Sequence, residues 1–101
     1  MQAASSPLGP LERMLKGRGL FLSVERSDAV EVVYVCVDDG IPGGYPVGYV
    51  ISSRTGTWTA YARVRPGRIF TTDEISSGLA SVEEAIRAVV AHARYEDVLT
   101  A

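Results

Sequence analysis

The sequence predicts an α+β domain with a short N-terminal helix, an antiparallel sheet of four to five strands, and a C-terminal helix packed on one sheet face. One observation is a strict alternation of apolar and polar side chains over residues 57–65, which is typical of a half-buried strand. The other is an apolar stripe with helical spacing over residues 81–94. The stripe is expected to cover the apolar side chains of the strand, which are Trp58, Ala60, Ala62 and Val64.

Length and composition indicate one globular domain. The chain has 101 residues, 47% apolar and 22% charged, and a chain of this size buries roughly 60–70% of its unfolded surface. We expect the domain to span residues 8–96. Residues 1–7 are expected to be disordered or fraying, and residues 97–101 to fray at the other end.

The N-terminal part predicts a helix followed by a hairpin. Leu8–Lys16 has apolar residues at helical spacing, and Pro10 suits a first helical position. Leu20–Arg26 and the Val-rich Val30–Val37 read as two strands joined by a short turn, which predicts an antiparallel pair.

A long loop separates this hairpin from the next strand. Asp38–Pro46 contains three glycines and two prolines, which do not fit regular structure. Tyr45–Ser53 reads as the third strand. Pro46 and Gly48 weaken its start, so we expect an edge position or a bulge.

The second half predicts a strand, a loop and the C-terminal helix. Thr57–Arg65 is the fourth strand, and Trp58 is expected to contribute most to the core. Arg68–Thr71 reads as a short fifth strand, and Thr72–Ala80 as a loop with at most one helical turn. Ser81 and Glu84 then form a capping box at the start of the last helix.

Charge and targeting features favour a cytoplasmic protein that binds no membrane. The net charge is −2, which argues against a general binder of nucleic acid or anionic membranes. No apolar run reaches the ~20 residues of a membrane-spanning helix, and the N-terminus does not resemble a signal peptide. Lys16 is the only lysine among ten basic residues, a bias typical of a GC-rich genome such as that of an actinobacterium or its phage.

The residues that carry chemistry do not form a catalytic pattern. Cys36 lies in a Val-rich strand, so we interpret it as a small buried hydrophobe and not as a reactive thiol. His92 is expected to be a partly exposed helix residue. Asp38 and Asp39 precede a glycine and read as a turn, with half of a metal site as the alternative. We therefore expect no enzyme, no metal and no cofactor.

A local excess of arginine gives the candidate binding site. Residues 54–68 hold four arginines and no acid, or +4, so the remainder must carry −6 to reach the total of −2. Such a stripe would suit phosphates and base edges, an acidic protein surface, or a solvated strand face. The predicted binding residues are Arg54, Thr59, Tyr61, Arg63, Arg65, Arg68 and Tyr45.

A resemblance to a known family falls on the same region. The pattern Gly56-x-Trp58-x-Ala60-x-Ala62-Arg63, with Phe70-Thr71-Thr72 and Glu84-Ala85 further on, is similar to the small DNA-binding domains at the N-termini of tyrosine integrases. This resemblance implies a three-stranded sheet that reads DNA. The chain departs from the pattern in its acidity, in the segment Ile75–Ala80, and in two additional N-terminal strands.

The sequence thus predicts a small non-catalytic binding or regulatory protein. It would act through protein–protein contacts of an exposed sheet face and the Gly/Pro-rich loop. A protein partner is the first expectation. A homodimer built on an exposed strand edge, notably that of the third strand, is the second. The alternative is a nucleic-acid-binding module that uses the arginine, tyrosine and threonine side chains of the same face.

Overall fold

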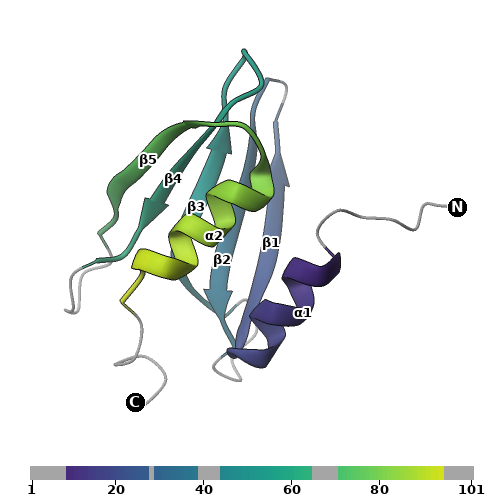
Figure 1. The fold of residues 1–101 in the computed structure, drawn as a ribbon, viewed down its shortest axis with the longest axis vertical. Helices are drawn as coiled ribbons and strands as arrows, with labels where there is room; N and C mark the ends of the chain where they lie inside the picture. Colours follow the sequence, from purple (N-terminus) through teal and green to yellow (C-terminus); the bar gives the residue numbers. More distant parts are fainter. Residues whose placement is uncertain (1–8, 28, 39–43, 65–70, 95–101) are drawn as a thin grey trace, which may run out of the picture.

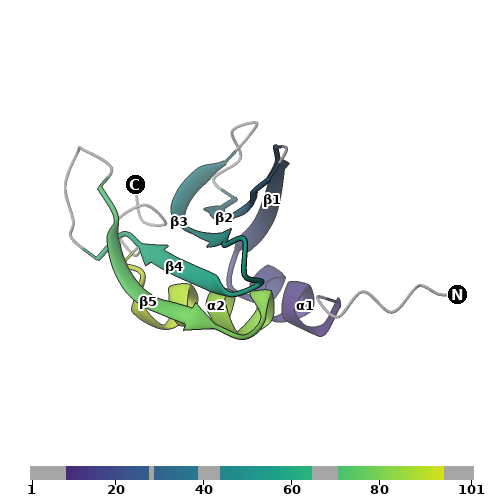
Figure 2. The same cartoon turned by 90° about the horizontal axis from the view of Figure 1, so that it is seen from above.

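A computed structural model describes residues 9–27, 29–38, 44–64 and 71–94. These residues form one sheet with two helices on the same side of it (Figures 1 and 2). The termini predicted to fray, residues 1–7 and 97–101, lie outside the described residues, as do Arg65, Arg68 and most of the predicted loop.

The architecture confirms the predicted fold class. The sheet has five antiparallel strands in the order β1-β2-β3-β4-β5, so each strand pairs with its neighbour in sequence. The helices α1 and α2 precede and follow the sheet in the chain. The elements are α1 Gly9–Gly17, β1 Leu20–Arg26, β2 Glu31–Val37, β3 Tyr45–Ser52, β4 Trp58–Ala62, β5 Asp73–Leu79 and α2 Val82–His92.

The turn between β3 and β4 shows why these strands form a tight hairpin. Ser53 donates its amide N–H to the carbonyl of Thr57, and the Ser53 hydroxyl accepts the amide N–H groups of Thr55 and Thr57. Gly56 has φ of 87°, a left-handed conformation that only glycine adopts without strain. The bond between Ser53 and Thr57 leaves a loop of three residues, 54–56, with glycine last. Such a loop is a common hairpin connection.

The third strand is central, not an edge. β3 pairs with β2 on one side and with β4 on the other, so the expectation of an edge position is wrong, and so is a homodimer argued from that edge. The expectation of a bulge is confirmed, because the register shifts between Val35 and Cys36 opposite Pro46 and Gly48. The outer strands are β1 and β5.

The segment Thr72–Ala80, predicted as a loop, contains β5. Its Ser-Ser-Gly run has little intrinsic strand preference, but β4 offers a free edge with which it pairs. Ile75 and Leu79 then pack against the core. Two register shifts between β4 and β5 accommodate the poor strand sequence. Tertiary pairing therefore decides the structure of this segment.

The core lies between the sheet and the two helices. Ala60 and Ala62 are fully buried against α2, as the alternation predicted, and Ile86 and Val89 of the helix are fully buried opposite them. Trp58 is half-buried and packs against this core without being one of its fully buried members; that it contributes most to the core stays a prediction. It is the first residue of β4 and pairs with Leu79, the last residue of β5.

The Ser81 half of the predicted capping box is confirmed, whereas the Glu84 carboxylate bonds the residue before Ser81. The Ser81 hydroxyl accepts the amide N–H of Glu84 at 3.1 Å. The Glu84 carboxylate accepts the amide N–H of Ala80, also at 3.1 Å. The first bond satisfies an N–H group that the first helical turn leaves without a partner. The second holds the backbone of Ala80, which lies just before the N-terminal cap residue Ser81.

Candidate functional site

The face of the sheet away from the helices carries a row of three tyrosines. In the antiparallel register, Tyr34 lies opposite Tyr49, and Tyr49 lies opposite Tyr61. The row continues to Ser23 on β1 and to Glu74 on β5. Side chains that are directly opposite in adjacent strands share a face, so one row of side chains crosses all five strands.

The tyrosine rings contact one another. The rings of Tyr49 and Tyr61 are stacked, with centroids 4.8 Å apart and an interplanar angle of 17°. The rings of Tyr34 and Tyr49 are tilted by 48°, with centroids 5.8 Å apart. Such aromatic contacts hold each ring in one orientation at little further entropic cost.

We call this surface the tyrosine face. It consists of the row of tyrosines and the neighbouring side chains of the same strand faces. In the residues that the structure describes, both helices pack on the opposite side of the sheet. The tyrosines are half-buried, which fits side chains shielded by their neighbours in the row. The neighbours are Glu25 of β1, Val32 of β2, Ile51 of β3 and Thr59 of β4.

A carboxylate at each end of the row helps to raise the pKa of the tyrosine nearest to it. A hydrogen bond to Glu25 is the main cause that raises the pKa of Tyr34 above its ordinary value of 10.0. Burial is the main cause that raises the pKa of Tyr61, and the negative charge of Glu74 adds to it. The phenols of Tyr34 and Tyr61 therefore stay neutral at physiological pH, and each presents an apolar ring with a hydroxyl at its tip.

Arg63 does not lie on this face, which corrects the sequence-based expectation. It follows the end of β4 and is buried, with 1% of its surface exposed. One guanidinium nitrogen, Nη1, donates to the carbonyl of Arg94 at 2.7 Å. The guanidinium carbon lies 5.7 Å from the centre of the Tyr45 ring. The alternation breaks here because the chain leaves β4 after Ala62 and turns the next side chain into the structure.

The other predicted binding residues are divided among different places. Thr59 and Tyr61 belong to the tyrosine face. Tyr45 packs against the core on the helix side, beside Arg63. Arg54 is exposed in the turn between β3 and β4. The described residues therefore do not bring the predicted arginines together on one surface.

The residues considered for catalysis have structural surroundings. Cys36 is buried, and burial raises the pKa of its thiol above 9.0, which agrees with its interpretation as a buried hydrophobe. His92 is exposed near the end of α2, where its Nδ1 lies 2.9 Å from the carbonyl oxygen of Ala88. Asp38 donates its amide N–H to the carbonyl of Gly19, and Asp39 lies outside the described residues.

Within the described ranges, no three His, Cys, Asp or Glu side chains lie close enough together to hold a metal ion. None of the described helices has the length and hydropathy needed to cross a membrane.

A hollow of about 340 Å³ lies between α1 and the start of β1. Its walls combine apolar side chains such as Leu20 and Leu22 with the charged Glu12, Lys16 and Asp38. The charges have mixed sign and lie on exposed residues, so they select no particular ligand class.

Comparison with known proteins adds no relationship. No family model matches the chain, and no curated protein and no solved structure shows a significant similarity to it. The resemblance to the integrase DNA-binding domains thus has no support from these comparisons.

Sequence reasoning missed two of the three tyrosines. Tyr34 and Tyr49 each lie in a predicted strand, at positions that alternation assigns to one face of that strand. Their meeting depends on the register between strands, which the bulge in β3 and the turn lengths set. A search for tyrosines at equivalent places in successive strands of a meander would have found the row.

Proposed function

We propose that this protein is a small non-catalytic binding or regulatory protein whose tyrosine face binds another protein. The observation that carries the proposal is the contacting row of Tyr34, Tyr49 and Tyr61 on the sheet face opposite the helices. Tyrosine is enriched at the energetic centres of protein interfaces, because its ring gives apolar contact area and its hydroxyl forms hydrogen bonds.

The composition of this surface supports binding more than catalysis. Among the described residues, its ionisable groups are the phenols, the carboxylates of Glu25 and Glu74 at the two ends, and the buried thiol of Cys36, which alternation places on the Tyr34 side of β2. A nucleophile or general base requires a partner group within hydrogen-bonding reach. The hydrogen bond between Tyr34 and Glu25 instead keeps the phenol protonated.

The charges on and near the tyrosine face favour a protein partner over a nucleic acid. Nucleic-acid binding depends on exposed arginine and lysine side chains that neutralise phosphates. Arg63 is buried and linked to the end of α2, and carboxylates stand at both ends of the tyrosine row. These negative charges would repel a phosphate backbone.

Affinity capture with face-specific variants tests the proposal. The protein is immobilised and exposed to a lysate of its source organism, and the retained proteins are compared for three forms. The first is the wild type and the second combines Tyr49→Ala with Tyr61→Ala. The third is a matched control on the helices, Lys16→Ala with Arg87→Ala, at exposed positions.

The expected result is a partner retained by the wild type and by the helix control and lost from the tyrosine variant. Hydrogen exchange on the isolated complex should then show protection in β2, β3 and β4. Equal retention by the tyrosine variant would refute the proposal. So would a salt-dependent affinity for short oligonucleotides that requires the same tyrosines, because that result would make the face a nucleic-acid site. Sedimentation of the protein alone reports whether the partner is a second copy.

A further inference from the structure

The charge on the tyrosine face indicates the chemistry of the partner. This inference rests on the proposed function and adds what the partner must present. The register of β1 and β2 places Glu25 on the same face as Tyr34, at that end of the row. Glu74 lies directly opposite Tyr61 at the other end. An aromatic centre between two negative ends is complementary to positive charge.

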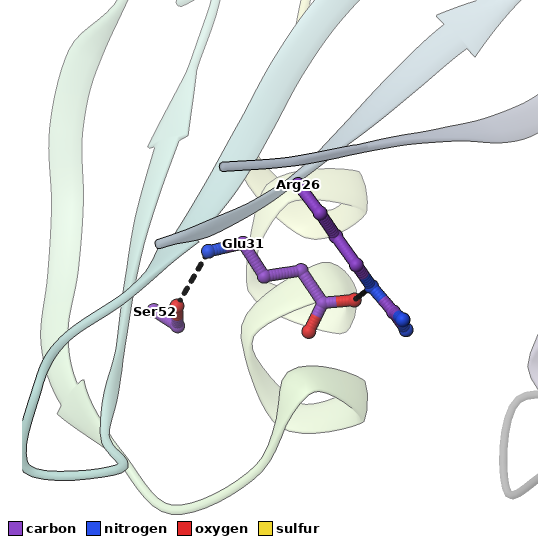
Figure 3. A network of polar contacts seen from close by, with 3 residues as sticks. All are labelled: Arg26, Glu31 and Ser52. Atoms are coloured by element: carbon purple, nitrogen blue, oxygen red, sulfur yellow. Dashed lines mark hydrogen bonds and ion pairs between the residues drawn. The ribbon is translucent and has the colours of Figure 1, made fainter. Parts of the chain in front are cut away.

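Positive charge in the sheet lies elsewhere. In the five strands as the structure describes them, Arg26 is the single lysine or arginine. Strand alternation places it with Leu22 and Val24, on the helix side. Its Nε lies 3.0 Å from the Glu31 carboxylate, while the amide of Glu31 donates to the hydroxyl of Ser52 (Figure 3). Arg26 therefore does not neutralise the carboxylates of the tyrosine face.

The charge balance of the chain points in the same direction. Residues 54–68 contribute +4, and the remainder contributes −6. Glu25, Tyr34, Tyr49 and Glu74 all belong to that acidic remainder. An acidic surface steers a basic partner toward itself and discriminates against acidic ones.

Aromatic rings favour arginine over lysine as the group that docks here. The guanidinium is planar, stacks on aromatic rings and binds a carboxylate through two parallel hydrogen bonds. Among the described residues, the Arg63 guanidinium makes a ring contact of this kind, 5.7 Å from the centre of the Tyr45 ring. The tyrosine face offers the same ring together with a carboxylate at each end.

We propose that the tyrosine face binds an arginine-containing basic segment of a partner protein. In this arrangement, guanidinium groups pack against the tyrosine rings and donate hydrogen bonds to Glu25 and Glu74. Four strand spacings of about 4.8 Å separate β1 from β5, or about 19 Å, and an extended chain of about six residues spans that distance. A hexapeptide is therefore a suitable probe.

The test is a titration of the ¹⁵N-labelled protein with amidated hexa-arginine, hexa-lysine and hexa-glutamate peptides at two salt concentrations. We expect hexa-arginine to shift the amide resonances of Tyr34, Tyr49 and Tyr61, with a dissociation constant several times lower than that of hexa-lysine. Hexa-glutamate should leave these resonances unchanged. Equal affinity for hexa-arginine and hexa-lysine, or arginine-induced shifts confined to the helices, would overturn the inference.

A pair of charge variants separates specific binding from attraction by net charge. Glu25→Gln with Glu74→Gln removes both carboxylates of the face. Glu12→Gln with Glu83→Gln removes the same charge from the helices. We expect the first pair to weaken hexa-arginine binding about three- to tenfold, and the second pair less than about twofold. Equal weakening by both pairs would overturn the inference, because binding would then follow total charge.

Ring and hydroxyl contributions are separated by two further variants. Tyr49→Phe retains the ring and should retain most of the hexa-arginine affinity, whereas Tyr49→Ala should lose it. Both are compared with the wild type by thermal unfolding, so that a folding defect is recognised. If Tyr49→Phe loses as much affinity as a folded Tyr49→Ala, the ring does not bind the guanidinium, and the inference fails.

Failure of this inference can be distinguished from failure of the proposed function. If the captured partner depends on Tyr49 and Tyr61 but not on the two face carboxylates, and hexa-arginine does not displace it, the basic-segment inference is wrong while the protein-binding proposal stands. If the tyrosine variant captures the partner as well as the wild type does, both are wrong.

Discussion

Arg63 and Arg94 are joined by two hydrogen bonds in opposite directions. The amide of Arg94 donates to the carbonyl of Arg63 at 2.6 Å, and Nη1 of Arg63 donates to the carbonyl of Arg94 at 2.7 Å. These two bonds join the segment that follows β4 to the segment that follows α2. An arginine that the sequence assigned to an exposed face holds the helix end against the sheet.

Replacing Arg63 by leucine should destabilise the fold by about 2 kcal/mol. The variant removes the donor to a part-buried carbonyl and the packing of the side chain, and such losses each cost on the order of 1–3 kcal/mol. Arg63→Lys keeps a cationic donor and should lose less. Urea unfolding measures the difference. A loss below about 0.5 kcal/mol for leucine, as for an exposed surface position, would contradict the buried arrangement.

Gly48→Ala should destabilise the protein because α2 lies very close to β3 there. A Cβ atom at Gly48 would lie 2.5 Å from Cγ1 of Val89 and 2.6 Å from the carbonyl oxygen of Tyr61. Overpacking of this kind costs about 1–3 kcal/mol. Because the Tyr61 oxygen belongs to the backbone, adding Val89→Ala should not restore wild-type stability. The control is Gly17→Ala, where a Cβ meets nothing within 4 Å, and denaturant unfolding should show no loss for it.

Ser81→Ala should reduce stability by about 1 kcal/mol, the usual cost of removing a helix N-terminal capping side chain. The Ser81 hydroxyl accepts the amide N–H of Glu84, and alanine offers no acceptor. Ser81→Asp supplies another acceptor and a negative charge at the helix N-terminus, so it should retain the stability. Thermal unfolding followed by circular dichroism measures both. Equal melting temperatures for Ser81→Ala and the wild type would show that the cap contributes nothing.

Stability should fall as the pH rises above about 10, and Tyr34 should cause part of the fall. The folded protein raises the pKa of Tyr34 above 10.0, chiefly through its hydrogen bond to Glu25, with smaller contributions from burial, Tyr49 and Cys36. The unfolded chain then loses this proton at a lower pH than the folded protein does. The stabilisation is therefore complete below pH 10.0 and is lost as the pH rises through the folded pKa.

Urea unfolding at several pH values between 9 and 11 tests this dependence. Tyr34→Phe cannot ionise, so its stability should decline less over that range than that of the wild type. Absorbance at 295 nm follows phenolate formation directly. Parallel declines for the two proteins would show that Tyr34 does not contribute.

Cys36 should react slowly with iodoacetamide while the protein is folded. Its thiol is buried and its pKa is raised by that burial, and the reactive species is the exposed thiolate. We expect the modification rate at pH 8 to be at least about tenfold lower than in urea, because reaction then requires an opening of the structure. Mass spectrometry measures the extent of modification. Similar rates in the folded and unfolded protein would contradict the burial of this residue.

Much of the secondary structure could be predicted because its causes are local. The alternation around Ala60 and Ala62 identified β4 and its buried face, and the Ser81–Glu84 pair identified the start of α2. β5 could not be predicted in this way. Its sequence has little strand preference of its own, and it becomes a strand because β4 presents unpaired backbone groups beside it.

The sequence by itself determined the fold class, the buried face of β4 and the acidic character of the chain, since these follow from periodicity and composition. Only the tertiary structure decided which side chains meet. Alternation predicted that Arg63 shares a face with Tyr61, but the strand ends at Ala62 and the guanidinium turns toward Arg94. Tyr34, Tyr49 and Tyr61 form one row because three successive strands pair in one register. Register is a relation between distant segments, fixed by a bulge and by hairpin turns together, and no single segment encodes it.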